Sequence, residues 1–593
     1  MNDSHDYDAE DLKEKTPTVV QNWFPATLKK WEILLRMFHW LVWTSGLVYV
    51  LGCFVTCKTN YTLPEVVPDE FVDGSYGIPR DKDTADEEWY RYSTAIRRFW
   101  PWVLVQPLIS HCLFAKCHKW LSSFYAAYST FFLLYNVGWL TTASFYTLYI
   151  TFYITAKYRS TLVCYLLGLA VIIHSAFPVL TFLKPVYLYH GSVETFLTQV
   201  GLSWTAARCM SFAIDAIARP STKNNPEIDT SLAYILYLPA LFTGPLQNYS
   251  DFSVQVTKQK TAWSAQDIMY PAVQVGLCTL YYFLLEALLH YFYSSALAYY
   301  PDLVAEMDDP SLLGLGICLT VLFFLKYRIL YGFGSAVAGL EGMALPPPPK
   351  CVSRIHLCSY LWRHFDRGLY LWIQRYIYQP VVARGWTPQR RMVGAAASFA
   401  FVCSWHGMDR AVVVWCTLNF VGISTELLME VIRNKDSWKR IEEIFFNKMW
   451  LRFLRAVVSA PHFLFSMFSC MFFLSNVDIG LIFLRRIICG PLPGVTRADA
   501  AGPGPAGISA LSAHHYRLPL PLGRPGSNPR HLQKGRHRLS FPFSPHLGGP
   551  LQRLQCCLGR GRVGSHSQEE TTFLVNYLTA RRCKTVSNCS DRL

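Results

Sequence analysis

The sequence carries little charge. Asp, Glu, Lys and Arg make up 16% of its 593 residues, whereas soluble domains carry about 25%. Apolar residues make up 52% and aromatic residues 15%. So few charged side chains cannot cover the surface of a water-soluble protein of this length. The composition therefore excludes an ordinary soluble enzyme and predicts a polytopic membrane protein.

The first thirty residues also have little of the pattern that predicts a cleavable leader. Residues 1–30 mix acidic and basic side chains and lack the basic start and apolar stretch of a secretory leader. We therefore expect residues 1–30 to form a cytosolic N-terminal segment, followed by an apolar run that acts as a signal anchor. Lys29 and Lys30, directly before that run, favour the cytosolic side.

The eighteen cysteines lack the paired spacings of a zinc ribbon or a disulfide framework. Most lie in or beside apolar runs, where a cysteine usually serves as a small apolar side chain. Cys351 differs because it follows the stiff proline segment Pro346–Pro349 and Lys350. This segment would hold the thiol on a surface loop, where a thiolate can ligate a metal or haem. A role as an ordinary small side chain is the alternative.

Long apolar runs recur along the chain, several of them near the roughly 20 residues that span a bilayer as a helix. The expected fold class is therefore an all-α polytopic membrane protein with about ten transmembrane helices. The runs are Trp40–Val55, Trp100–Phe114, Phe124–Val137, Leu140–Ile154, Leu162–Leu183, Val273–Leu289, Leu312–Leu325, Met392–Val402, Val412–Leu428 and Val457–Leu474.

Two further segments are too polar or too broken to be simple spans. Val193–Ala218 contains Arg208 and Asp215, and Leu232–Leu246 contains Pro239 and a Gly-Pro pair. Backbone of this kind is tolerated in membranes when it is buried among other helices or lines a cavity. We expect re-entrant segments here.

An acid and a histidine near the middle of the chain are candidate functional residues. Asp366 lies in a segment whose apolar positions from Leu361 to Tyr376 follow a helical period. His406 lies in a nearly unbroken apolar run, and Trp405 beside it is expected to offer a flat wall. Ionisable groups at membrane depth are costly and often functional, and a histidine exchanges protons near neutral pH. The alternatives are a salt bridge of Asp366 with a neighbouring arginine and a core histidine bonded to a carbonyl.

These segments together resemble the membrane-bound O-acyltransferase family, and within it the branch that transfers palmitate to the N-terminal cysteine of secreted proteins. The resemblance runs in order from about residue 31 to about residue 489. It rests on Phe323–Tyr327, Pro346–Cys351, Leu361–Leu369, Arg375–Pro380 and Phe399–Gly407, with further likeness at Arg208-Cys209, Tyr237–Pro239, Gly244-Pro245 and Leu474–Asn476.

The resemblance implies a catalytic role for His406 and an essential acid at Asp366. It implies that Trp362 lines the acyl-CoA passage, that Asn476 is a lesser polar group of the active site, and that Cys351 ligates haem iron. The implied donor is palmitoyl-CoA. The implied acceptor is a secreted Hedgehog-type protein, acylated on the nitrogen of its N-terminal cysteine.

The implied location is the endoplasmic reticulum membrane, with the Golgi as a second expected location, where membrane lipids surround the protein. His406 as general base, with Asp366 orienting the amine or balancing charge, is one arrangement; the residues do not decide which group takes the proton. Other functions stay open. They are a lipid O-acyltransferase of the same family, a non-catalytic regulatory relative and a transporter, although few spans carry the polar residues that transport needs.

The chain changes character after residue 489. Residues 490–593 hold 14 Lys and Arg against 4 Asp and Glu, so they supply 10 of the 15 net positive charges. They are rich in Pro and Gly, and we expect a disordered, atypical tail after a domain over 31–489. The basic balance arises mostly in this tail, and the sequence shows no nucleic-acid recognition module.

Overall fold

A computed structural model describes residues 26–116, 118–176, 192–218, 227–258, 263–351, 357–383, 385–445 and 448–488. This described part is helical apart from two short strands, β1 (Phe71–Val72) and β2 (Lys82–Asp83), which pair antiparallel with Phe71 opposite Asp83. The predicted all-α class is therefore confirmed for these residues. The segment 1–25 and the tail 490–593 lie outside them.

The described helices vary widely in length. The helices of at least fifteen residues are α1 (Ala26–Thr56), α3 (Glu87–Lys116), α4 (Leu121–Asn136), α5 (Trp139–Lys157), α6 (Thr161–Ala176), α8 (Ser192–Ala218), α11 (Ala265–Leu288), α14 (Asp309–Leu340), α18 (Pro388–His406), α19 (Arg410–Arg433) and α21 (Lys448–Leu474). The shorter ones are α2 (Lys58–Val66), α9 (Ile228–Ile235), α10 (Tyr249–Thr257), α12 (Ser294–Leu297), α13 (Pro301–Ala305), α15 (Cys358–His364), α16 (Arg367–Ile373), α17 (Gln379–Val382), α20 (Asp436–Phe445) and α22 (Val477–Ile488).

Four helical segments in the described part of the chain are long and apolar enough to cross a membrane. They are Ile33–Val66, which joins most of α1 to α2, and the helices α11, α14 and α19. Each predicted apolar run falls on a helix as far as the described residues extend, but the other helices are too short or too polar by this measure. The expected count of about ten membrane helices is therefore not confirmed.

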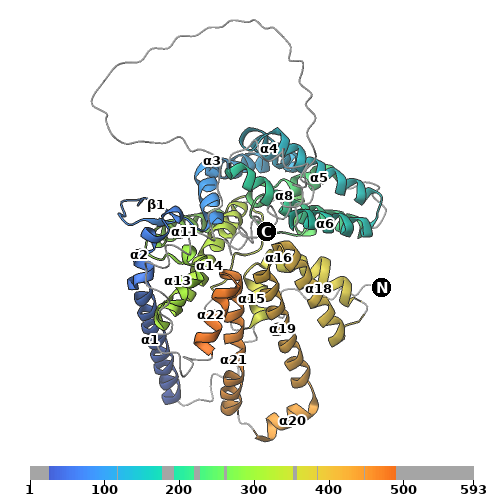
Figure 1. The fold of residues 1–593 in the computed structure, drawn as a ribbon. Helices are drawn as coiled ribbons and strands as arrows, with labels where there is room; N and C mark the ends of the chain where they lie inside the picture. Colours follow the sequence, from blue (N-terminus) through green and yellow to red (C-terminus); the bar gives the residue numbers. More distant parts are fainter. Residues whose placement is uncertain are drawn as a thin grey trace, which may run out of the picture. The chain divides into compact units, whose positions relative to one another are not determined.

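Helix α14 is the structural centre of the membrane part. It packs against α1, α3, α11 and α21, and Figure 1 shows it beside α11. Phe323, Tyr327 and Tyr331 follow each other at intervals of four residues and so lie on one face of this helix. This face is directed to the pocket described below.

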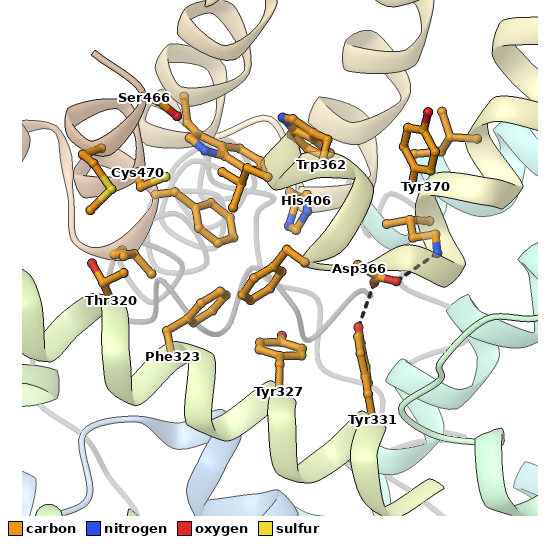
Figure 2. Close-up of a pocket in the computed structure, with 18 residues that line it drawn as sticks. Thr320, Phe323, Tyr327, Tyr331, Trp362, Asp366, Tyr370, His406, Ser466 and Cys470 are labelled. Atoms are coloured by element: carbon orange, nitrogen blue, oxygen red, sulfur yellow. Dashed lines mark hydrogen bonds between the residues drawn. The ribbon is translucent and has the colours of Figure 1, made fainter. Parts of the chain in front are cut away.

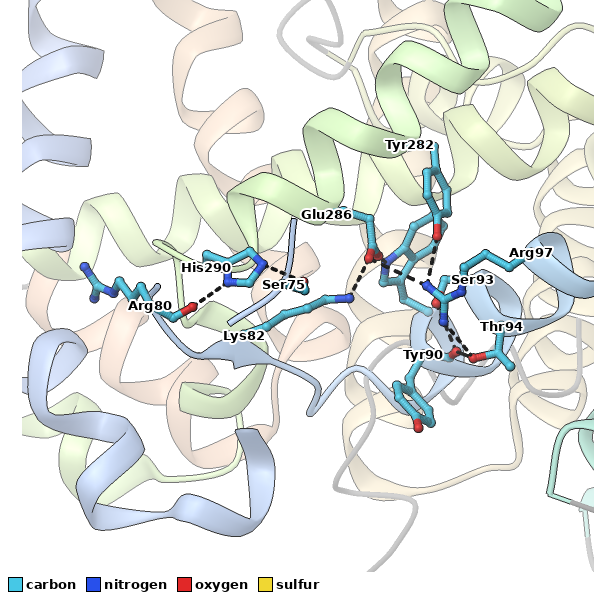
Figure 3. Close-up of polar contacts among 11 residues, drawn as sticks. Ser75, Arg80, Lys82, Tyr90, Ser93, Thr94, Arg97, Tyr282, Glu286 and His290 are labelled. Carbon is cyan, nitrogen blue, oxygen red and sulfur yellow. Dashed lines mark hydrogen bonds and ion pairs between the residues drawn. The ribbon is translucent and has the colours of Figure 1, made fainter. Parts of the chain in front are cut away.

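The polar segment that runs from the loop after α2 into the first turn of α3 is fastened to α11 and the turn that follows α11 (Figure 3). Lys82 Nζ lies 2.6 Å from Glu286 Oε2, and the Trp89 indole donates to Glu286 Oε1 at 2.8 Å. His290 joins the same loop, because its Nδ1 lies 2.6 Å from the Arg80 carbonyl and its Nε2 lies 3.1 Å from the Ser75 hydroxyl. The buried charge of Glu286 is thus satisfied by partners far away in sequence.

A second buried ion cluster ties the start of α3 to α14. Lys326 is 1% exposed, and its Nζ lies 2.9 Å from Asp86 Oδ2 and 2.7 Å from Glu88 Oε2. The Tyr327 hydroxyl donates to Glu88 at 3.0 Å. Removing one member of such a cluster leaves an uncompensated buried charge, which typically costs about 3–5 kcal/mol. The cluster therefore fixes the rotation of α14 and, with it, the face that carries Tyr331.

The expected single helix from Leu361 to Tyr376 is wrong. The chain forms α15, breaks at Phe365 and Asp366, and restarts as α16, which continues into a π-helical turn over Gln374–Tyr378. Asp366 is the N-cap of α16: its backbone is non-helical, and its side chain accepts the Leu369 N–H. An N-cap acid ends one helix as it begins another, and an apolar period of 3.6 residues does not reveal such a break.

The two segments predicted to be re-entrant differ from each other. Val193–Ala218 belongs to one continuous helix, α8, whose charges have partners inside the protein: Arg208 donates to the Ile235 carbonyl at 3.2 Å, and Asp215 pairs with Arg375 at 3.0 Å. Leu232–Leu246 is broken, as expected, into the end of α9, a 3-10 turn at Leu238–Ala240 and a buried loop. Their depth in a bilayer stays a prediction.

Candidate active site

One pocket brings His406, Asp366 and Trp362 together. It holds about 1040 Å³ of space, part of which is open to the outside, and aromatic and aliphatic side chains supply most of its wall. Figure 2 shows the three residues around the same cavity, with Phe323, Tyr327 and Tyr331 of α14 across from them. The predicted acid and base thus share one cavity.

His406 occupies the last turn of α18. Gly407 caps this helix with φ at +102°, a left-handed conformation that favours glycine, and so turns the chain directly after the histidine. The imidazole is buried, with the residue 5% exposed, between the rings of Trp415 at 5.6 Å and Phe473 at 5.3 Å. The pocket therefore holds a proton-exchanging group with an apolar wall around it.

Asp366 is held by two hydrogen-bond donors. Its Oδ1 accepts the Leu369 N–H and its Oδ2 accepts the Tyr331 hydroxyl, each at 2.9 Å (Figure 2). Burial raises the pKa of this carboxyl to about 6, although both donors favour the charged form and oppose the rise. Among the described residues no ion pair joins Asp366 to Arg363 or Arg367, so a surface salt bridge does not describe this acid.

Trp362 lies between the pocket and α19. Its indole N–H donates to Asn419 Oδ1 at 3.1 Å, and its ring lies 5.3 Å from that of Trp415. Trp415 in turn stacks on Phe473 at 4.2 Å. The wall expected from Trp405 is supplied by these other rings, because Trp405 packs against Trp204 and is outside the pocket lining.

Sequence reasoning missed Tyr331, Trp415 and Phe473 as pocket residues. The aromatic stripe Phe323, Tyr327, Tyr331 on α14 is a signal that could have revealed the first. Trp415 and Phe473 lie on α19 and α21, and only the tertiary packing brings them to His406. Their local sequences are ordinary apolar helix.

Asn476 and Cys351 lie outside the pocket lining. Asn476 precedes α22, where its side chain accepts the Ile479 N–H at 2.9 Å and donates to the Ala298 carbonyl at 3.1 Å. This is a helix cap with a tether to the segment after α12, and a substrate role for Asn476 stays a prediction. Cys351 is exposed at the end of the proline segment.

The architecture defines a class of protein before any comparison is made. Apolar helices long enough to cross a membrane accompany a pocket of mostly apolar side chains, whose lining includes one imidazole, His406, and one carboxylate, Asp366. Such a site can accept a long apolar group and move a proton beside it. The molecule is a helical membrane protein with a candidate acid–base site inside.

Comparison with known proteins makes the assignment more specific. Residues 189–456 match the model of the membrane-bound O-acyltransferase family. The matched range includes Trp362, Asp366 and His406, whereas the expected domain bounds of 31–489 are wider.

Relatives extend the similarity over most of the chain. It is 27% identical to the mouse protein-cysteine N-palmitoyltransferase HHAT-like protein, over 71% of this chain and 83% of that protein. It is 24% identical to the Drosophila melanogaster protein-cysteine N-palmitoyltransferase Rasp, over 68% and 80%, and 23% identical to mouse protein-cysteine N-palmitoyltransferase HHAT, over 70% and 85%. The membrane-bound O-acyltransferase GUP1 of Saccharomyces cerevisiae is 25% identical over only 31% of this chain.

Proposed function

We propose that this protein transfers palmitate from palmitoyl-CoA to the nitrogen of the N-terminal cysteine of a secreted Hedgehog-type protein. The observation that carries the proposal is the single pocket in which His406 and Asp366 meet an apolar wall. Three relatives that align over about two thirds or more of this chain are named for N-palmitoylation of cysteine, which supports the same reaction here.

The chemistry requires a base. An α-amine has a pKa near 8, so it is mostly protonated and non-nucleophilic at neutral pH. After one proton leaves, the nitrogen attacks the thioester carbonyl. The carbon–sulfur bond then breaks, and CoA departs as a thiolate that takes up a proton. General-base help typically contributes 10²–10⁴-fold to such a step.

We assign the base to His406 and charge balance to Asp366. The Asp366 carboxylate is fixed by Tyr331 and Leu369 and is mostly ionised above its pKa of about 6. A fixed anion beside the pocket attracts the substrate ammonium and stabilises an imidazolium after proton transfer. The buried imidazole of His406 can accept the proton without leaving the pocket.

The pocket wall suits a long acyl chain. Leu361, Trp362 and Ile373 line it from α15 and α16, and Met467 and Leu474 line it from α21. A saturated chain gains about 0.8 kcal/mol for each methylene removed from water. A smaller hollow that contains Asp86 shares Phe323 and Leu474 with this pocket and offers a separate approach for a polar acceptor.

We further propose that Cys351 ligates haem. The exposed thiol ends a proline segment that is fastened to α15, because the Lys350 N–H donates to the His364 carbonyl at 3.1 Å. Accessibility and a thiolate donor suit haem ligation. Purified protein should show a Soret band that Cys351→Ala removes; a colourless wild-type protein, prepared with haem supplied, would reject the ligand role. We place the protein in the endoplasmic reticulum or Golgi membrane, where a secreted acceptor passes.

An acceptor assay tests the proposed function. Purified protein receives labelled palmitoyl-CoA with a Cys-initiated Hedgehog-type peptide, the same peptide with an acetylated N-terminus, or a lysophospholipid. We expect label on the free peptide in a hydroxylamine-resistant amide and little on the other two. Preferential labelling of the lysophospholipid would establish the lipid O-acyltransferase alternative, and no transfer to any acceptor would support a non-catalytic relative.

A further inference from the structure

A second cluster of reactive side chains lies apart from the acid–base pair. The Cys358 thiol, the Glu426 carboxylate and the His462 imidazole come from α15, α19 and α21, and their ligand atoms all lie within 4.8 Å of one another. His462 Nε2 is 2.7 Å from Glu426 Oε1. None of the three residues lines the pocket of His406.

The types of donor match a particular class of metal ion. One thiolate, one imidazole and one carboxylate are the ligands that Zn²⁺ takes in proteins, with ligand atoms about 2.0–2.3 Å from the ion. In a tetrahedral site of that size two ligand atoms are roughly 3.5 Å apart. The three donor atoms lie within 4.8 Å of one another, so side-chain rotations that bring them to this separation would place them around one ion.

The surroundings are built for a sulfur atom and a fixed carboxylate. Cys358 is fully buried, and a Cβ added at Gly422 would lie 2.6 Å from its Sγ, so only glycine leaves room for the thiol against α19. Glu426 is one turn beyond Gly422 on the same face. Both of its oxygens accept the Ser359 N–H, each at 3.3 Å. A backbone donor that orients a ligating carboxylate is the usual outer support of a metal site.

An ion pair between Glu426 and His462 accounts for only two members of the cluster. It gives no reason for a buried thiol beside them or for a glycine that makes space for that thiol. Ser466, one turn after His462 on α21, contacts the Cys358 thiol and also lines the pocket. Its hydroxyl or a water molecule is placed to complete four-coordination.

We propose that Cys358, Glu426 and His462 bind one Zn²⁺ ion, which cross-links α15, α19 and α21 beside the pocket wall. Binding replaces the thiol proton, which passes to solvent. The ion would fasten the start of α15, four residues before Trp362, to the helices that carry Trp415 and Cys470. This site is distinct from Cys351 and independent of which acceptor the enzyme uses.

Metal content of the full-length protein tests the proposal. After washing with a weak chelating resin, wild-type protein should retain about one zinc ion per chain, and Cys358→Ser and His462→Ala should each weaken binding by at least about tenfold. Cys164→Ala, which removes a buried thiol from α6, and Cys351→Ala are the matched controls and should retain the zinc. Zinc loss in the Cys351 variant alone, or equal binding by all variants, would overturn the assignment.

Cobalt spectroscopy decides the question even if a variant does not fold. Co²⁺ added to zinc-stripped wild-type protein should give thiolate-to-cobalt charge-transfer and tetrahedral d–d bands, and added Zn²⁺ should abolish them. A wild-type protein that lacks zinc after purification and shows no thiolate–cobalt band would refute the site. Peptide acylation by a zinc-free variant would not support the proposed zinc site, because this experiment measures metal binding and not the reaction.

Discussion

At the level of single residues, folding makes ionisation of the Asp366 carboxyl less favourable than it is in the unfolded chain. Its carboxylate has two donors, yet burial still raises its pKa to about 6. An acid whose folded-state pKa lies above its ordinary value stabilises the fold only while it is protonated. This contribution is complete below about pH 3.9 and is lost as the pH rises through about 6. The proposed reaction therefore uses the ionised carboxylate, whereas the folded state is more stable with the protonated acid.

The Asp366→Asn variant separates the effect of the charge on palmitoyl transfer from its effect on stability. The amide oxygen can still accept the Leu369 N–H, but the buried charge is gone. At pH 7.5 we expect a melting temperature equal to or above that of the wild-type protein, with palmitoyl transfer reduced at least about 10²-fold. Thermal unfolding in detergent and single-turnover transfer measure the two effects. A variant that melts well below wild type would show instead that the carboxylate is a structural anchor.

The pH dependence of transfer should report the same carboxylate. Below about pH 6 Asp366 becomes protonated, so kcat/KM should fall on the acid side. Tyr331→Phe removes a hydrogen bond to the anion, worth about 1.5 kcal/mol, and should move the acid limb upward by about one pH unit. Tyr370→Phe is the control, because Tyr370 lines the same pocket and its hydroxyl is not among the hydrogen-bond donors to Asp366. If Tyr331→Phe left the acid limb at the same pH, the acid limb would not report the ionisation of Asp366.

The residue types of the acid and base could be predicted from sequence, but their surroundings could not. His406 and Asp366 were recognisable as ionisable groups among apolar residues, and the structure places both in one pocket. Trp405 was expected to be the neighbouring wall, and Trp415 takes that place. Adjacent residues on a helix point in different directions. The wall beside His406 is therefore set by packing between helices, which the neighbouring residue in the sequence did not predict.

At the scale of elements, the break between α15 and α16 determines where Asp366 points. Beside this break, Gly368 lets the loop of Leu246 approach α16, because a Cβ at position 368 would lie 2.4 Å from the Leu246 carbonyl oxygen and 2.7 Å from its nitrogen. The loop after the 3-10 turn therefore packs directly on the backbone of α16. Helical periodicity predicted the apolar stripe of this region but not its interruption, since capping and backbone contact are independent of that period.

Gly368→Ala tests this contact. The added methyl group would clash with backbone atoms, so α16 should shift and the protein should lose about 1–3 kcal/mol of stability. Palmitoyl transfer should also fall, because Asp366 is two residues away. Gly276→Ala in α11 is the matched control: its added Cβ meets nothing within 4 Å, and helix propensity predicts a slight gain. Equal behaviour of the two variants in unfolding and transfer assays would disprove tight packing at Gly368.

At the scale of the whole molecule, the described chain ends without another crossing. The 12 residues of α22 span about 18 Å, which is short of the roughly 30 Å hydrocarbon core. Arg486, near its end, donates to Asp309 at 2.5 Å and to the Ala305 carbonyl at 3.4 Å, which ties α22 to the start of α14. Composition predicted a membrane protein, whereas the number of crossings depends on depth in a bilayer.

The side of the membrane reached by the tail can be measured. If α21 leaves the cytosol at Arg452 and Arg455, residues 490–593 enter the lumen, and the sequon at Asn588 becomes open to glycosylation. A C-terminal tag should then resist protease until the lumen is permeabilised, and Asn588→Gln should remove an endoglycosidase-sensitive mass shift. Digestion of the tag while the lumen is sealed would reverse the predicted topology.

The most direct test of the central claim is transfer of labelled palmitate to a Cys-initiated peptide by wild-type protein and by His406→Ala. His364→Ala is the matched control, because His364 lies on α15 near Asp366 but outside the pocket lining. We expect His406→Ala to lower the single-turnover rate at least about 10²-fold at unchanged melting temperature, and His364→Ala to transfer palmitate at close to the wild-type rate. Wild-type activity in His406→Ala, or equal losses in both variants, would show that His406 is not the base.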